Sequence, residues 1–212
     1  MRAVSATLKP RKSPVQARSA VTVDALHLAA IQVLIREGLS RCTTTRVAER
    51  AGMSVGSLYQ YYPNRDALLA AVLERHLEGI AAAVERACQT HRGQPLSRMA
   101  SAFVVAFLTA KLRHPEEAKA LYAVAEERGG FALAALMRAR ITAAVAAMLT
   151  SAPDAEFDDP TLVAEVALGA LVGPIQTLLT EDPPAAFAPR VERELVLLVT
   201  AYLQAYQSGT TS

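Results

Sequence analysis

Apolar residues recur at intervals of three and four along most of this 212-residue chain, which is the period of amphipathic α-helices. The first predicted helix covers 21–37 and ends at Gly38. Two short helices follow, at 44–51 and 55–61, joined by the three-residue turn 52–54. The alternating β-branched and aromatic segments that indicate strands are missing. The pattern therefore predicts an all-α protein.

After Cys88 the same period predicts a series of longer helices. Three of them precede residue 150, and two more follow at 161–179 and 188–206. The intervening segments, which carry Pro, Gly and Asp, are typical of loops. In front of the first helix, residues 1–20 are basic, contain two prolines and have no apolar period, so we expect a flexible arm.

Charge is divided unevenly between the two ends of the chain. Residues 1–80 hold eleven Lys and Arg against six Asp and Glu, a balance of +5. The remaining residues hold 22 − 11 = 11 basic against 20 − 6 = 14 acidic side chains, a balance of −3. A basic first third indicates that this end meets a polyanion, although a solvated basic tail would give the same balance.

The sequence holds no pattern for catalysis, for a metal ion or for a cofactor. Cys42 and Cys88 lack the spacing of metal ligands, and Ser-His-Asp, carboxylate-pair and glycine-rich phosphate patterns are missing, so we predict no enzyme. The start lacks the apolar segment of a signal peptide, and the longest uncharged stretch, Val166 to Thr180, is too short to span a bilayer. A reduced, cytoplasmic protein is the expectation.

Two short helices joined by a glycine turn form a helix-turn-helix, which places its second helix in the DNA major groove. We expect Thr43 and Ser54 to cap the two helices, and Tyr62 to pack inward beside Leu58. Gln60 can pair with adenine, and tyrosine hydroxyls suit phosphate oxygens. The residues expected to face DNA from the second helix are Val55, Gly56, Ser57, Tyr59, Gln60 and Tyr61.

The segment "TTTRVAERAGMSVGSLYQYYPNRDALL", Thr43 to Leu69, resembles the DNA-binding domain of the TetR (tetracycline-repressor-like) family of transcriptional regulators. Five features of the segment follow one another in the family's order. They are a helix cap, the glycine of the turn, a Leu-Tyr pair, an aromatic residue before proline, and the motif Arg-x-Ala-Leu. The resemblance implies that Thr43 and Thr45 contact phosphates, and that Arg65 replaces a phosphate-binding Lys. The chain departs from the family at Tyr61, where His is frequent, and at Tyr62, where Phe is frequent.

The resemblance also implies a homodimer formed by the last two helices and a ligand cavity inside the C-terminal helices. It divides the chain into the arm at 1–20, a DNA-binding domain of three helices at 21–68, a ligand-binding and dimerisation bundle at 69–207 and a tail at 208–212.

Apolar stripes along the last two helices supply the candidate dimer interface, although an intramolecular core would need the same stripes. The interface residues are Leu162, Val166, Gly169, Gly173, Val191, Leu195, Leu198 and Tyr202. Aromatic, methionine and a few polar residues supply candidate liners of the cavity, where plain core is the alternative. The pocket residues are Phe103, Phe107, Tyr122, Met137, Arg138, Ile141 and Gln176.

These observations predict a ligand-responsive DNA-binding regulator, a repressor released from a palindromic operator by a small apolar effector. An activator, or a regulator controlled by a protein partner, would share the DNA-binding segment. A helical binding protein whose helix-turn-helix is only structural is the third alternative.

Overall fold

The computed structural model describes residues 17–126, 130–180 and 187–207. Within these residues the chain forms nine α-helices and one short 3₁₀ helix, and an isolated β-bridge pairs Ala155 with Gln207. The all-α prediction is confirmed. The helices are α1 (Ala17–Glu37), η1 (Leu39–Arg41), α2 (Thr44–Arg50), α3 (Val55–Tyr61), α4 (Arg65–Thr90), α5 (Leu96–Leu112), α6 (Pro115–Glu126), α7 (Gly130–Leu149), α8 (Pro160–Thr180) and α9 (Phe187–Gln204).

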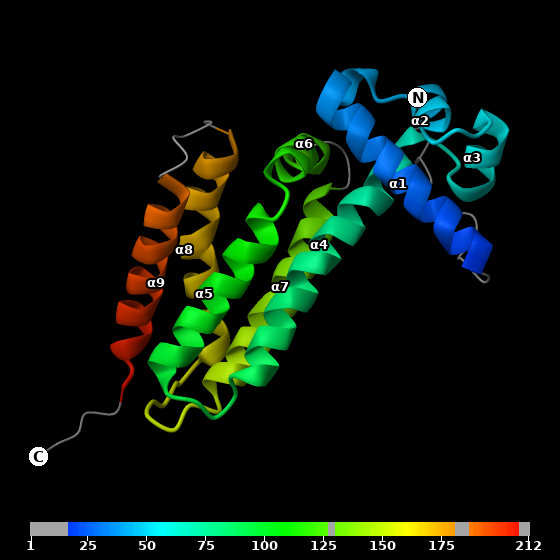
Figure 1. Cartoon of the computed structure of the whole chain (residues 1–212). Coiled ribbons are helices and arrows are strands. Elements are labelled where there is room, and N and C mark those ends of the chain that lie inside the picture. Colours follow the sequence, from blue (N-terminus) through cyan, green and yellow to red (C-terminus); the bar gives the residue numbers. More distant parts are fainter. Residues whose placement is uncertain (1–16, 127–129, 181–186, 208–212) are drawn as a thin grey trace, which may run out of the picture. The chain divides into compact units, whose positions relative to one another are not determined.

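The chain divides into two compact units, and α4 and α7 each contribute to both (Figure 1). The N-terminal unit comprises residues 1–77 together with 116–134, so it holds α1 to α3, the first half of α4, α6 and the start of α7. The C-terminal unit comprises 78–115 together with 135–212. Of the arm predicted at 1–20, residues 17–20 form the first turn of α1, which differs from the prediction, whereas 1–16 and the predicted tail at 208–212 lie outside the described residues.

The N-terminal unit has one hydrophobic cluster that joins all of its helices before α7. Leu26 of α1 and Leu58 of α3 are fully buried in it, and Leu69 of α4 and Leu121 of α6 are almost so. Helix α1 ends as predicted at Gly38, whose φ of 77° is a left-handed conformation that glycine adopts at little cost. The cluster therefore ties the two short helices to α4 and α6.

The C-terminal unit is a helical bundle in which α9 packs against both α5 and α8. A loop carboxylate holds one end of it together. Asp154 accepts the backbone N–H of Leu96 at 3.0 Å and thereby satisfies the start of α5, where Pro95 has no side-chain donor or acceptor. Asp154 also accepts a hydrogen bond from Nε2 of Gln207 at 3.0 Å, which fixes the chain after α9.

In the part of the chain that the structure describes, three helical segments are long and apolar enough to cross a membrane by length and composition: Ser19–Glu37, Gly130–Leu149 and Pro160–Leu179. The uncharged stretch Val166 to Thr180, which is too short to span a bilayer, lies mostly inside the third segment, and that segment is longer because it includes Glu165. In the fold, 33% to 39% of each segment is buried inside the protein. Each of them thus packs part of its surface within the protein.

Candidate nucleic-acid interface

The turn between α2 and α3 has the capped geometry of a helix-turn-helix. Thr43 begins α2, and its hydroxyl accepts the backbone N–H of Arg46 at 3.3 Å. Ser54 begins α3 and accepts the N–H of Ser57 at 3.1 Å. Between them Gly52 has a φ of 69°, which a residue with a side chain rarely adopts. The predicted caps and the predicted glycine turn are confirmed.

The inward face of this motif is fully buried. Leu58 of α3 is 0% exposed, and Val47 and Ala48 of α2 are similarly enclosed. Tyr62, which ends α3, is only 3% exposed and packs inward as predicted. Burial of these apolar side chains sets the angle between α2 and α3, and it leaves the opposite face of α3 open.

The hydroxyl of Tyr62 has a partner that the sequence did not reveal. It lies 2.6 Å from Nε2 of His27, on α1. Burial, with a smaller contribution from the nearby Arg75, lowers the pKa of His27 to about 4, so the imidazole is neutral at physiological pH. Because thirty-five residues separate the two, no local sequence pattern could have paired them.

The exposed face of α3 carries the side chains best placed to meet DNA. Tyr59 is 41% exposed, and Gln60 and Gly56 are also exposed. The Tyr59 hydroxyl lies 3.2 Å from Oγ1 of Thr44, at the start of α2. This contact fixes the direction of the tyrosine ring, so Thr44 is a positioning residue, and sequence analysis missed it between Thr43 and Thr45.

The other predicted groove residues are less open. Val55, Ser57 and Tyr61 are half-buried, and Val55 and Tyr61 pack partly against the hydrophobic cluster. The Ser57 hydroxyl lies 2.9 Å from that of Ser54. The structure therefore separates an exposed set on α3 from a half-buried set that also supports the fold. Thr43 and Thr45 are both exposed.

Arg65, expected to bind phosphate, is half-buried and has a structural contact. Its Nη2 donates to the carbonyl oxygen of Leu39 at 3.0 Å, which connects the start of α4 to the segment between α1 and α2. Asn64 caps α4, since its Oδ1 accepts the N–H of Ala67 at 2.8 Å. The guanidinium thus positions α4, and a phosphate contact stays a prediction.

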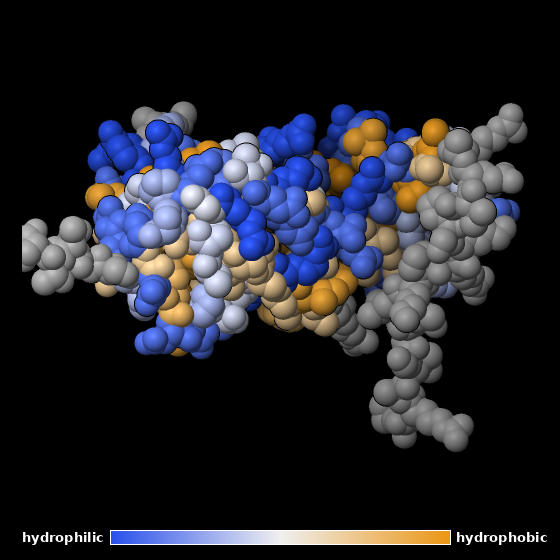
Figure 2. Space-filling model, turned by 90° about the horizontal axis from the view of Figure 1, so that it is seen from below, coloured by the Kyte–Doolittle hydropathy of each residue, from blue (hydrophilic) through white to orange (hydrophobic). Residues whose placement is uncertain are grey.

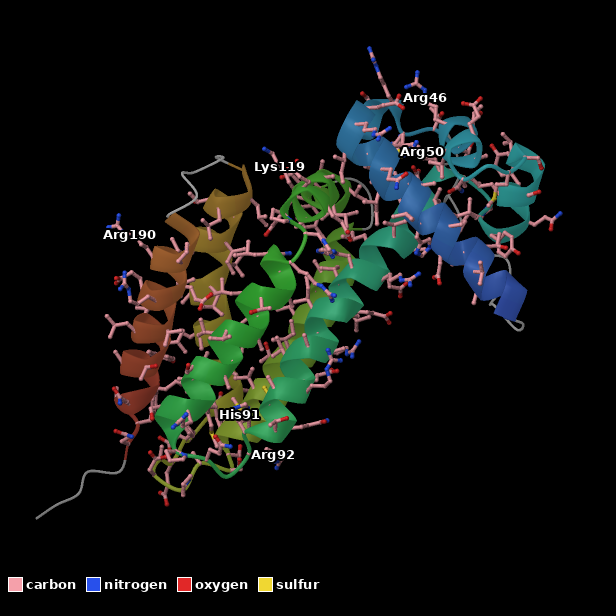
Figure 3. All side chains as sticks on the ribbon, viewed as in Figure 1. Arg46, Arg50, His91, Arg92, Lys119 and Arg190 are labelled. Carbon is pink, nitrogen blue, oxygen red and sulfur yellow. The ribbon has the colours of Figure 1, made fainter. Side chains whose placement is uncertain are left out.

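Two further arginines project from α2 (Figure 3). Arg46 forms an ion pair with Glu37, and Nε of Arg50 donates to the side-chain oxygen of Gln32 at 2.6 Å. Both are exposed and add positive charge to the unit that carries the helix-turn-helix. Their spacing of four residues places both on one helix face, a pattern that is already present in the sequence.

The predicted pocket residues do not all share one environment. Phe103, Phe107, Met137 and Ile141 are buried in the C-terminal unit, whereas Tyr122 belongs to the N-terminal unit. Two polar members are corrected. Gln176 is exposed on α8, and Arg138 is exposed on α7, where its guanidinium lies 3.9 Å from the Glu165 carboxylate. Their charge and polarity keep them on the outer faces of these helices.

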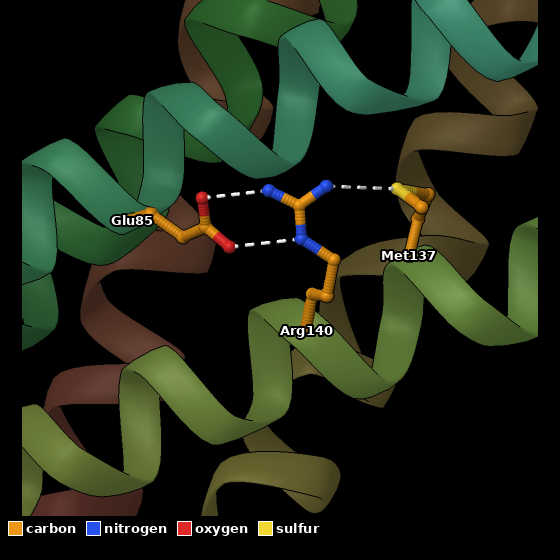
Figure 4. A network of polar contacts seen from close by, with 3 residues as sticks. All are labelled: Glu85, Met137 and Arg140. Atoms are coloured by element: carbon orange, nitrogen blue, oxygen red, sulfur yellow. Dashed lines mark hydrogen bonds and ion pairs between the residues drawn. The ribbon is translucent and has the colours of Figure 1, made fainter.

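A second arginine of α7 connects that helix to α4 inside the C-terminal unit (Figure 4). Nε and Nη2 of Arg140 donate to the two carboxylate oxygens of Glu85 at 3.0 and 2.9 Å, and Nη1 lies 3.5 Å from the Met137 sulfur. Beside this pair a shallow groove of about 390 Å³ exposes the alanines of α7.

The residues of the candidate dimer interface are exposed to solvent on α8 and only partly exposed on α9. Leu162 and Val166 are 56% and 47% exposed, and Gly169 and Gly173 share that open face. On α9, Leu198 is 51% exposed.

Three other α9 residues proposed for the interface are less exposed than Leu198. Leu195 is only 3% exposed, because the inward face of α9 contains 195, 199 and 203, so its assignment to the interface is wrong. Val191 and Tyr202 are half-buried. Leu197, which the predicted interface did not include, is 63% exposed on the outer face of α9. Figure 2 shows one face of the molecule, on which patches of apolar residues lie between polar ones.

Two family models match this chain. Residues 27–72 match the model described as "Bacterial regulatory proteins, tetR family", which covers the helix-turn-helix. Residues 95–203, more than half of the chain, match "Tetracyclin repressor-like, C-terminal domain". Among curated proteins, the HTH-type transcriptional activator FasR of Mycolicibacterium smegmatis is 34% identical over 65 residues, which are 31% of this chain and 30% of FasR. The chain thus matches about a third of that relative's length.

Solved structures share the fold over most of its length. A bacterial regulatory protein of the tetR family from Rhodococcus RHA1 superposes with a TM-score of 0.62 at 19% identity, covering 84% of this chain and 96% of that one. SmeT, the repressor of the Stenotrophomonas maltophilia multidrug efflux pump SmeDEF, gives a TM-score of 0.61 at 18% identity, with 89% and 91% covered. At these identities the likeness shows the fold.

Proposed function

Because the chain belongs to the tetR family of bacterial regulatory proteins, we propose that it acts in the cytoplasm as a homodimeric, ligand-responsive repressor of transcription. Each protomer would bind one half of a roughly palindromic operator, and a small effector would release it. The chain's own geometry supports the DNA-binding part of this proposal most directly.

The observation that carries the proposal is the exposed face of α3. A helix-turn-helix that served only as structure would have no reason to hold Tyr59 outward by a hydrogen bond to Thr44 or to leave Gln60 free on the same face. Gln60 can read a base edge, and Tyr59 can donate to a phosphate oxygen. The arginines of α2 add charge for the phosphate backbone.

Dimerisation is supported by the open apolar faces of α8 and α9. Monomeric soluble proteins rarely expose large contiguous apolar patches, and Leu162, Val166, Leu197 and Leu198 are each close to half exposed or more. A two-fold dimer would cover them and would carry two recognition helices to successive major grooves.

Release by an effector requires that the ligand bind more tightly to a form whose recognition helices no longer match the grooves. We place the effector among the buried aromatic and apolar residues of the C-terminal unit, near Phe103 and Ile141. Few charges face that core, so a largely apolar effector suits it, because a buried unpaired charge would be costly.

The direct test is a fluorescence anisotropy titration with duplex DNA at several salt concentrations. Each phosphate that the protein neutralises should contribute about −0.9 to the slope of log affinity against log salt. Several contacts should therefore give a steep negative slope. A slope near zero, or no retention of DNA at low salt, would refute DNA binding, and an increase of transcription from the bound promoter would indicate an activator.

A further inference from the structure

The outer face of α1 carries a line of exposed apolar side chains, which we call the α1 stripe. It consists of Val21, Leu28 and Ile35, which are 68%, 57% and 43% exposed and follow one another at intervals of seven residues. Seven residues complete almost two turns of an α-helix, so the three side chains lie in one line along it. Single apolar side chains are ordinary on a protein surface, whereas a line with this spacing is typical of a face that meets another helix.

The α1 stripe is separate from the surfaces already assigned. Leu26 of α1 and Leu58 of α3 are buried in the same cluster, so each helix turns its outer face away from that cluster. The candidate dimer interface lies on α8 and α9 in the C-terminal unit, whereas α1 belongs to the N-terminal unit. Neither the recognition helix nor that interface therefore accounts for the stripe.

Two polar side chains flank Leu28 on the same face, one on each side along the helix. Asp24, whose side chain is 57% exposed, forms an ion pair with Arg75 of α4. Gln32 accepts a hydrogen bond from Nε of the exposed Arg50 at 2.6 Å. The face therefore has a carboxylate four residues before Leu28 and a guanidinium beside the residue four positions after it.

This face is complementary to itself in an antiparallel arrangement. A two-fold axis through Leu28 places each residue before it opposite the residue equally far after it in the second copy. Leu28 then meets Leu28, and Val21 meets Ile35. Asp24 meets Gln32 and the guanidinium beside it, and a carboxylate can accept from more than one guanidinium. A parallel pair would instead place the two Asp24 carboxylates against each other, which like charge disfavours.

We propose that the α1 stripe docks on the α1 stripe of a second copy of this chain, antiparallel about Leu28, and that this contact makes neighbouring dimers bind DNA cooperatively. Three apolar side chains from each copy bury too little area for a stable complex of free proteins. Two copies on one duplex are held at a high effective concentration, where a weak contact suffices. The cooperative half rests on the proposed function, whereas the pairing half does not.

Single cysteines in the full-length protein test this register. Leu28→Cys lies on the two-fold axis, so bismaleimidoethane, a short crosslinker, should join two copies through it. Val21→Cys should not react with itself, because positions 21 and 35 are about 21 Å apart along a helix. A mixture of Val21→Cys with Ile35→Cys should crosslink. The native Cys42 and Cys88 are buried, and wild-type protein provides the blank.

Two measurements decide whether the pairing exists. Arg36→Cys is exposed on α1 outside the stripe and is the matched control for random collisions. Leu28→Cys should give at least about tenfold more crosslinked product than this control. Sedimentation should show that crosslinking at least doubles the mass of the native particle. Equal crosslinking at 28 and 36 would overturn the pairing and assign the face to a different partner, and an unchanged mass would place the contact within one dimer and overturn the link between dimers.

Anisotropy with random-sequence duplexes of two lengths tests cooperativity. A duplex of about 20 base pairs spans one pair of half-sites, and one of about 80 holds several dimers side by side. Leu28→Ser removes the central apolar contact without changing the charge. It should bind the short duplex like the wild type and the long one at least about threefold more weakly. Leu136→Ser, at a comparably exposed leucine of α7, should match the wild type on both.

The outcomes separate this inference from the proposed function. Equal affinity of the wild type and Leu28→Ser for the long duplex would overturn the cooperative role. Weaker binding of Leu28→Ser to the short duplex as well would place Leu28 in the DNA contact or the fold and overturn it too. If neither duplex were bound by any variant, the proposed function would fail, while crosslinking at position 28 would still establish the pairing.

Discussion

Tyr62 replaces the phenylalanine frequent in the family, and its hydroxyl is satisfied by His27. We expect Tyr62→Phe to lower the free energy of unfolding by about 1 kcal/mol, because it leaves a buried ring nitrogen without its partner. Urea denaturation followed by circular dichroism measures the change. In the double variant His27→Phe with Tyr62→Phe, the cost should be smaller than the sum of the single changes. Additive costs would show that the two side chains are not coupled.

The same histidine predicts how stability depends on pH. Its folded pKa of about 4 lies below its ordinary value of 6.5, so between these values the unfolded chain binds the proton more readily. His27 therefore supports the fold fully above pH 6.5, and stability should fall as the pH drops from 6.5 toward 4. The unfolding free energies of the wild type and of His27→Phe at pH 7 and pH 5 test this. A wild type that lost no more than the variant would contradict it.

Base recognition and phosphate contact should separate between two residues of α3. Gln60→Ala should relax sequence preference by about 1–3 kcal/mol at one base pair. Thr44→Val removes the hydroxyl that orients Tyr59, so it should weaken binding to all sequences alike, as should Tyr59→Phe. Competition titrations with operator and random duplexes distinguish these outcomes. A change of preference in Thr44→Val but not in Gln60→Ala would reverse the two roles.

At the scale of the element, the two faces of α9 should respond differently to substitution. Leu195 is buried within the protomer, so Leu195→Ala should lower its stability by about 2–5 kcal/mol. Leu198 is exposed on the other face, and Leu198→Glu should give folded monomers that have lost specific DNA binding. Sedimentation and thermal unfolding separate these effects. A monomeric wild type at micromolar concentration would rule out the dimer.

Local signals in the sequence predicted where helices begin and end. They predicted only in part which face of each helix is buried. Thr43, Gly52 and Ser54 could be assigned from sequence because a cap or a left-handed turn depends on a few adjacent residues. The predicted interface on α9 included both Leu195 and Leu198, because an apolar period shows that a helix has an apolar face. It does not tell which side meets the protomer's own core.

For the whole molecule, the sequence by itself determined the all-α class and the helix-turn-helix with Leu58 inward and Gln60 outward. These depend on period, caps and residue types within about thirty positions. The tertiary structure alone decided the pairing of His27 with Tyr62 and the packing of Leu121 of α6 into the same cluster as Leu58. Each requires segments far apart in sequence to meet, and that meeting is decided by packing of the whole cluster, which no local pattern encodes.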